Sequence, residues 1–147
     1  MTGIDCRKSK SVVSIARKLD EIQNWRNKSE SGDLGAKYNL ANAYMNGNGL
    51  PKNEHKAARL MVEAADGGYV PAQYALGTYF LNGSGVNSDY SLAYAFFNLT
   101  ASDLSGFRET AWAMDMITYM ENYFSRKDII QGQYFALEWE VNSQWYK

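Results

Sequence analysis

The chain has 147 residues, a length that suits one compact domain and is short for two, and its apolar share of 46% can form a real core. Its net charge of −1 gives no overall field to hold nucleic acid or an anionic membrane, and no apolar run reaches the ~18 residues of a membrane span. The single cysteine, Cys6, excludes an intrachain disulfide. As written, the sequence predicts a cytoplasmic protein; the alternative is a periplasmic or secreted one whose signal segment has been removed.

The first predicted helix covers residues 12–28 and belongs to an N-terminal helical cap or partial repeat over residues 1–30. Its apolar residues recur at helical spacing and form one stripe, so we interpret it as the second helix of an incomplete leading unit. The first 18 residues are basic, and we interpret these charges as a solvated helix face and not as a phosphate-binding arm. The predicted stripe contains Ile15, Leu19, Ile22 and Trp25.

The central part of the chain is a repeat with a period of 36 residues. Shifting the sequence by 36 positions aligns two segments without a gap and gives eight identical pairs. Such self-similarity is typical of architectures in which neighbouring units stack. We therefore expect one repeat over residues 34–69 and a second over 70–105. Identical pairs include Ala36 and Ala72, Tyr38 and Tyr74, Leu40 and Leu76, Gly47 and Gly83, and Gly49 and Gly85.

Each repeat is predicted to form two helices joined by a glycine-rich turn. Apolar residues recur at helical spacing over residues 34–45 and 54–65, and again over 71–81 and 89–101. Asn53 is a predicted N-cap of the second of these helices. No stretch alternates with the period of two that indicates a strand, so the pattern favours an all-α fold.

Residues 106–147 are predicted to form degenerate C-terminal helices. The first, residues 107–124, carries Ala111, Met114, Ile117 and Met120 at helical steps. Ser125 followed by Asp128 predicts a capping box at the start of the last helix, residues 126–141. We expect this last helix to bury Ile129, Ile130 and Leu137.

The repeat resembles the Sel-one-like repeat, which is related to the tetratricopeptide repeat. The residues that carry the resemblance run from Ala36 through Tyr44 to Gly47-x-Gly49-Leu50, and from Ala72 through Gly77 to Gly83-x-Gly85-Val86. Ala41 stands where the family usually has glycine, which leaves the fold prediction intact. The resemblance implies a right-handed α/α superhelix, a solenoid of tandem helix hairpins whose concave face binds other proteins.

A second stripe on the first helix of each repeat is the predicted partner-binding face. It lies beside the core stripe, and in related solenoids this side lines the concave surface. Tyrosine suits protein recognition because it offers a large contact area and a hydrogen bond at small entropic cost. The alternative is that the tyrosines only pack against neighbouring helices. The predicted residues are Tyr38, Asn42, Met45, Tyr74, Thr78 and Leu81.

The sequence specifies no catalytic residue, metal site or cofactor. The glycine-rich turns follow helices, whereas a phosphate loop follows a strand and is often succeeded by lysine. His55 is the only histidine, and it is far in sequence from Cys6, so a nucleophile–base pair or zinc site is hard to assemble. We therefore expect no small-molecule substrate and no enzyme activity.

The leading functional hypothesis is a protein-interaction adaptor that holds a peptide, loop or helix of a partner protein in its concave groove. An immunity or inhibitor protein that blocks a bacterial toxin or effector enzyme is the first alternative. An enzyme that uses the groove is the second.

Overall fold

The structure, a computed structural model, describes residues 6–142, and the side chains of residues 10–139. It holds seven helices and, within residues 6–142, no strand, so the all-α prediction is confirmed. Except for α1, which begins earlier and ends later, each helix starts and ends within one residue of its predicted bounds. The helices are α1 (Cys6–Glu30), α2 (Leu34–Asn46), α3 (Glu54–Asp66), α4 (Val70–Asn82), α5 (Tyr90–Ala101), α6 (Arg108–Tyr123) and α7 (Arg126–Asn142).

The two repeats use the same local chemistry at their turns. Gly47 and Gly83 end α2 and α4 with φ of 64° and 70°, the left-handed conformation that glycine adopts without steric cost. Side-chain oxygens of Asn53 and Asp89 then accept hydrogen bonds from the first turns of α3 and α5. Because stop and start signals recur at the same positions, α2–α3 and α4–α5 are equivalent hairpins.

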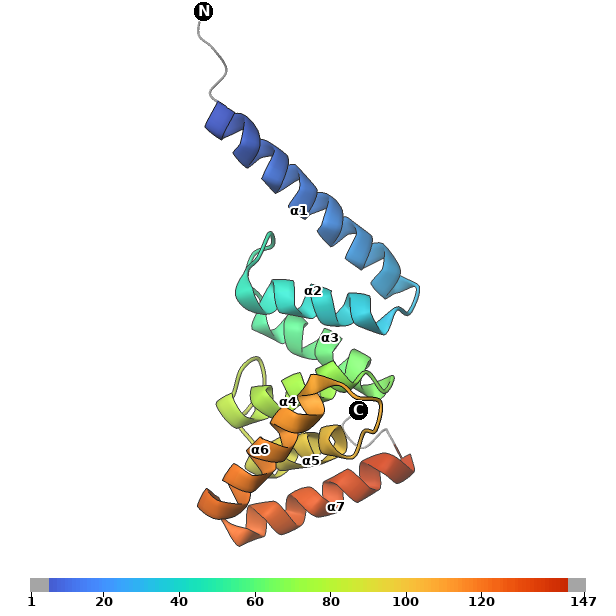
Figure 1. The fold of residues 1–147 in the computed structure, drawn as a ribbon, viewed down its shortest axis with the longest axis vertical. Coiled ribbons are helices and arrows are strands. Elements are labelled where there is room, and N and C mark those ends of the chain that lie inside the picture. The colour runs from blue at the N-terminus through green and yellow to red at the C-terminus, as the bar shows by residue number, and fades with distance from the viewer. Residues whose placement is uncertain (1–5, 143–147) are drawn as a thin grey trace, which may run out of the picture.

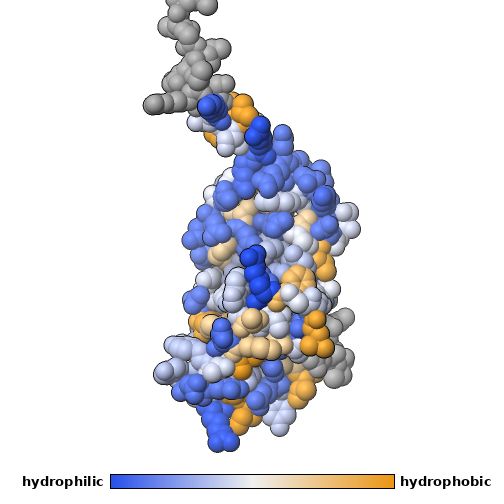
Figure 2. Space-filling view, viewed as in Figure 1, coloured by the Kyte–Doolittle hydropathy of each residue, from blue (hydrophilic) through white to orange (hydrophobic). Residues whose placement is uncertain are grey.

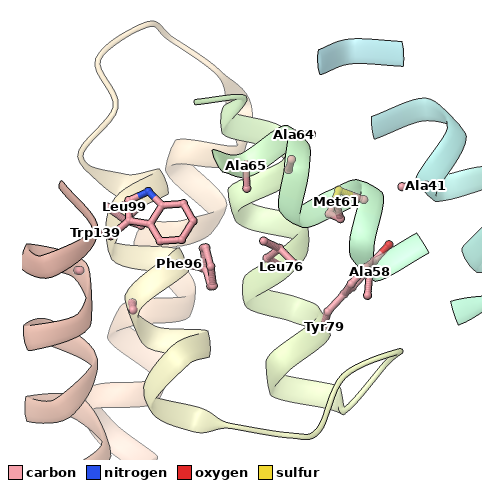
Figure 3. Packing of buried hydrophobic residues seen from close by; sticks show 13 residues of the cluster. Ala41, Ala58, Met61, Ala64, Ala65, Leu76, Tyr79, Phe96, Leu99 and Trp139 are labelled. Atoms are coloured by element: carbon pink, nitrogen blue, oxygen red, sulfur yellow. The ribbon is translucent and has the colours of Figure 1, made fainter. Parts of the chain in front are cut away.

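Helices α1 to α5 pack one on the next in chain order, which gives the stacked arrangement in Figure 1. The larger core cluster joins both repeats and α7, and Figure 3 shows Leu76 and Phe96 at its centre with Trp139 over Phe96. The Phe96 and Trp139 rings meet edge to face at 5.2 Å. The architecture is therefore an all-α helical repeat solenoid.

Each repeat pairs a small residue on its first helix with a large one on its second. Repeat one has Ala41 and Met61, and repeat two has Gly77 and Phe97 at the positions 36 residues later; all are buried. A Cβ atom on Gly77 would lie 2.6 Å from Cε1 of Phe97. The glycine is thus needed because the phenylalanine ring fills the space that a methyl group would occupy.

The last two helices depart from the hairpin pattern, because α6 and α7 both pack mainly on α5 and little on each other. At Gly132 of α7 a Cβ would lie 2.7 Å from the backbone oxygen of Ser91, so glycine allows this close approach. Ser125 is the N-cap as predicted, since its hydroxyl accepts from the Asp128 N–H. The Asp128 carboxylate accepts from the Ser125 hydroxyl, whereas in a full capping box it would accept from the backbone N–H of Ser125. The face of α7 turned to the core carries Ile129, Gly132, Ala136 and Trp139.

The predicted buried faces of α6 and α7 are partly wrong. Ile129 is buried, but Ile130 and Leu137 are 44% and 60% exposed, because α7 rests on α5 through the opposite side. On α6, Met120 is buried and Ile117 half-buried, whereas Ala111 and Met114 are exposed. Apolar character alone therefore did not identify the side of these helices that meets the core.

The predicted stripe of α1 is buried only near its C-terminal end. Ile22 is buried and Trp25 half-buried, whereas Ile15 and Leu19 are 60% and 53% exposed. Helix α1 packs on α2, and its N-terminal part projects beyond the stack (Figure 1). That part of the stripe therefore has no helix to cover it within the described chain.

Candidate protein-binding surface

The six residues of the predicted binding face lie on α2 and α4, and all are half-buried. Tyr38 and Met45 pack against the core cluster shared by both repeats, and Tyr74 and Leu81 against a second cluster formed by α5, α6 and α7. The hydroxyl of Thr78 donates to the Ala75 carbonyl at 2.7 Å. Because each side chain keeps part of its surface accessible, these positions combine packing with possible contact to a partner.

Tyr38 belongs to a row of rings that crosses from α2 towards α6. Its ring meets Tyr69, the residue before α4, edge to face at 5.5 Å. Tyr69 in turn meets Phe107, the residue before α6, at 6.4 Å and nearly perpendicular. Edge-to-face contacts are the favoured geometry of aromatic pairs. The row therefore links the N-terminal ends of α2, α4 and α6.

Tyr74 belongs to a second group that joins α4 to α5 and α6. Its ring lies 5.5 Å from Phe97 and 5.7 Å from Trp112. The Arg108 guanidinium lies over the Trp112 ring at 5.5 Å, which places a cation on the ring face. Trp112 is 45% exposed and Tyr74 half-buried, so one side of this group reaches the surface.

Glu109 is an acidic residue that acts electrostatically on a tyrosine in each of these two aromatic groups. It is 8% exposed, and one carboxylate oxygen lies 3.8 Å from Nε of Arg108. Burial raises the pKa of Tyr69, and Tyr38 and Glu109 raise it further. Burial likewise raises the pKa of Tyr74, with an added effect of Glu109. Both phenols therefore stay protonated at neutral pH and can donate hydrogen bonds.

We call Tyr38, Tyr69, Tyr74, Phe107 and Trp112 together the aromatic surface. Sequence reasoning identified Tyr38 and Tyr74 and missed the other three and Glu109. Two of the missed rings share a signal, because Tyr69 and Phe107 occupy the N-cap positions of α4 and α6. An aromatic residue at that position is unusual, since neither side chain accepts a capping hydrogen bond.

A hollow lies elsewhere, between α3 and the segment from α4 to α5. Its volume is about 680 Å³, with Phe80, Val86 and Phe96 among its apolar lining. Charged groups of α3, including Arg59 and Glu63, line it as well. We call this hollow the outer groove. It is a second place where a partner could bind, and sequence reasoning did not identify it.

Two other kinds of feature, a metal site and a membrane span, were considered for the described part of the chain. Among those residues, no three His, Cys, Asp or Glu side chains are grouped so that they could hold a metal ion. None of the helices there combines the length and the apolar character that a membrane span requires.

Comparison with known proteins identifies the repeats. The model of the Sel1 repeat matches residues 35–69 and again residues 70–103, which confirms the predicted resemblance. No curated protein matched the chain. Sel1 repeats are generally protein–protein interaction modules, and proteins of this fold are typically non-catalytic scaffolds.

Two solved structures are similar in fold. The first is c5321, described as a protective antigen of uropathogenic Escherichia coli strains with an SLR fold; it is 28% identical with a TM-score of 0.72. That match covers 80% of this chain and only 24% of c5321. The second is a Sel1 repeat protein from Oxalobacter formigenes, 29% identical with a TM-score of 0.58, in a match over 79% of this chain and 87% of that one.

Proposed function

Because the chain carries two tandem Sel1 repeats, we propose that it is an adaptor that binds a segment of a partner protein on the aromatic surface. The observation that carries the proposal is that aromatic rings from the region of α2, α4 and α6 form two groups in ring contact, each with an exposed member. Phe107 and Trp112 are 38% and 45% exposed, so a partner can reach them.

The chemistry of the surface favours a protein partner over a small molecule. Aromatic rings and arginine dominate the energetic centres of protein interfaces, and both occur here, with Arg108 over Trp112. The half-buried rings are held by their neighbours, so little side-chain entropy is lost when a partner binds. The fitting partner segment presents apolar side chains to the rings, with a hydrogen-bond acceptor for a tyrosine hydroxyl.

Affinity capture with the purified chain as bait, followed by mass spectrometry, tests this proposal. A Trp112→Ala bait should lose the partners that the wild-type bait retains, by at least about tenfold in signal, because truncating a tryptophan at the energetic centre of an interface costs about 2 kcal/mol or more. Leu104→Ala is the matched control, since Leu104 is 97% exposed and outside the aromatic surface. Equal capture by the wild-type and Trp112→Ala baits would place the binding face elsewhere.

The double variant Tyr38→Ala and Tyr74→Ala tests the two positions that the sequence singles out. It should abolish capture while the helical circular dichroism remains. Both rings also pack against neighbours, so its free energy of unfolding must be measured alongside. Unchanged affinity in the folded double variant would contradict a role of these tyrosines in binding.

The identity of the partner separates the adaptor from the immunity or inhibitor alternative. A captured enzyme that loses its activity in a 1:1 complex with this chain would favour the inhibitor. A captured protein whose own activity is unchanged in the complex would favour the adaptor.

A further inference from the structure

The outer face of α7 is an apolar stripe with nothing over it in the described chain. Ile130, Tyr134 and Leu137 follow one another at helical steps and are 44%, 65% and 60% exposed. The core-facing residues of α7, such as Gly132 and Ala136, lie on the opposite side of the same helix. Figure 1 shows α7 at one end of the helix stack, and Figure 2 shows apolar patches among the hydrophilic surface there. This end of the solenoid therefore lacks the polar outer face that terminal repeats usually have.

Two opposite charges flank the stripe, one towards each end. Lys127 precedes Ile130 by three residues, and Glu138 follows Tyr134 by four, so both share the angular side of the stripe. Both are exposed, and neither forms an ion pair with another residue whose side chain the structure describes. The face is thus basic at its N-terminal end and acidic at its C-terminal end, which makes it complementary to an antiparallel copy of itself.

The spacing along the helix agrees with such a pairing. When Ile130 of one copy lies opposite Leu137 of an antiparallel copy, Lys127 stands opposite residue 140, which is about 3 Å along the axis from Glu138. The four-carbon stem of lysine easily spans that offset. The same register places Tyr134 near the two-fold axis.

A hollow beside Ile130 provides room for the opposing side chain. It lies between the C-terminal end of α6 and the start of α7 and has a volume of about 360 Å³. Its lining is half apolar and half polar: Phe124, Ile129 and Ile130 on one hand, Glu121, Arg126 and Gln133 on the other. In the antiparallel register the partner copy's Leu137 lies over Ile130 and at the mouth of this hollow. An apolar side chain there would gain contacts that it lacks in the single copy.

We propose that the outer face of α7 is a self-association surface, on which a second copy of this chain docks with its own α7 antiparallel about a two-fold axis. The contact is isologous, so each copy gives and receives the same residues. The residues of the aromatic surface take no part in this contact, so the dimer is independent of the function proposed above. A single helix pair is smaller than a standard interface, so the dimer is weak, with a dissociation constant on the order of 10–100 µM.

Sedimentation equilibrium of the full chain from about 5 to 500 µM tests the proposal. The wild type should pass from monomer to dimer across this range, whereas Leu137→Glu should stay monomeric at every concentration. Ile15→Glu is the matched control, because Ile15 is equally an exposed apolar residue, 60% accessible, but lies on α1. Because both positions are exposed, each variant should fold, and circular dichroism is the check on this.

Exchange of the flanking charges tests the antiparallel register. Lys127→Glu alone and Glu138→Lys alone each bring like charges together twice in the dimer, and each should raise the dissociation constant by about tenfold. The double variant restores opposite charges and should return to within about threefold of the wild type. Three outcomes would overturn the proposal. The wild type could stay monomeric up to about 500 µM. The dimer could be lost in Ile15→Glu but kept in Leu137→Glu, or the double variant could dimerise no more tightly than the single variants.

Discussion

A double-mutant cycle that replaces Gly77 and Phe97 of repeat two by the alanine and methionine of repeat one tests whether the Phe97 ring requires glycine at position 77. Gly77→Ala places a methyl carbon 2.6, 2.7 and 2.9 Å from three ring atoms of Phe97, about 1 Å closer than the usual carbon–carbon contact. Phe97 is fully buried and packs against Tyr74, so its ring cannot swing away freely. Such overpacking costs about 1–3 kcal/mol, and better helix propensity returns up to about 1 kcal/mol. We expect a net loss of about 1–2 kcal/mol.

The other two variants of the cycle are Phe97→Met and the double variant, which carries the residue pair of repeat one. Phe97→Met alone removes ring contacts and leaves a space, at a cost of about 1–2 kcal/mol. The double variant Gly77→Ala with Phe97→Met reproduces the Ala41 and Met61 pair of repeat one. The methyl group then fills space that the ring has left, so the double variant should be more stable than the sum of the single changes by about 1–2 kcal/mol.

Urea denaturation followed by circular dichroism and tryptophan fluorescence measures each free energy of unfolding. Coincident transitions by the two probes would justify a two-state treatment, which repeat proteins do not always satisfy. A purely additive double variant, or a Gly77→Ala variant more stable than wild type, would show that Phe97 does not require glycine at position 77.

Three further predictions concern the core and the helix ends. Tyr79→Phe should be as stable as wild type or more stable at pH 7, because the buried hydroxyl has no hydrogen-bond partner among the described residues. Burial raises the pKa of Tyr79 from 10.0 to about 12, so its contribution to the free energy of unfolding is complete below pH 10 and is lost as pH rises to 12. Urea titrations at pH 7 and at about pH 11.5 should show a wild-type decline that is about 2 kcal/mol larger than that of Tyr79→Phe. Leu76→Asp should unfold the domain by circular dichroism, because Leu76 has no exposed surface and a charge there has no partner; a folded variant would contradict the helical register. Asp89→Ala should lower the free energy of unfolding by about 1 kcal/mol, since its carboxylate accepts from the Leu92 N–H at 3.0 Å; no change in denaturation would mean that this cap contributes nothing.

The sequence predicted the repeats well because their signals are local and occur twice. Glycines at positions 47 and 83 and caps at 53 and 89 determine where helices stop and start regardless of what packs on them. The aromatic surface was predicted only in part. The contact of Tyr69 with Phe107 joins residues 38 positions apart, and no helical period within one element reveals it.

The outer faces of the terminal helices could not be predicted from periodicity. An apolar stripe at the end of a solenoid gives the same helical pattern whether a neighbour covers it or not. Leu137 on α7 was therefore predicted to be buried, although tertiary packing leaves it exposed, and Ile15 on the apolar stripe of α1 is exposed as well. Gly132 was the overlooked indication, because a glycine within a helix often marks the side of closest approach.

Site-specific photo-crosslinking tests the central functional claim most directly. Once a partner has been captured, a benzophenone side chain is introduced in place of Phe107 on the aromatic surface, where it keeps the phenyl ring and leaves Trp112 intact, or in place of His55 at the outer groove. We predict that the partner crosslinks to position 107 and not to position 55. Crosslinking from position 55 alone would contradict the account and place the partner in the outer groove.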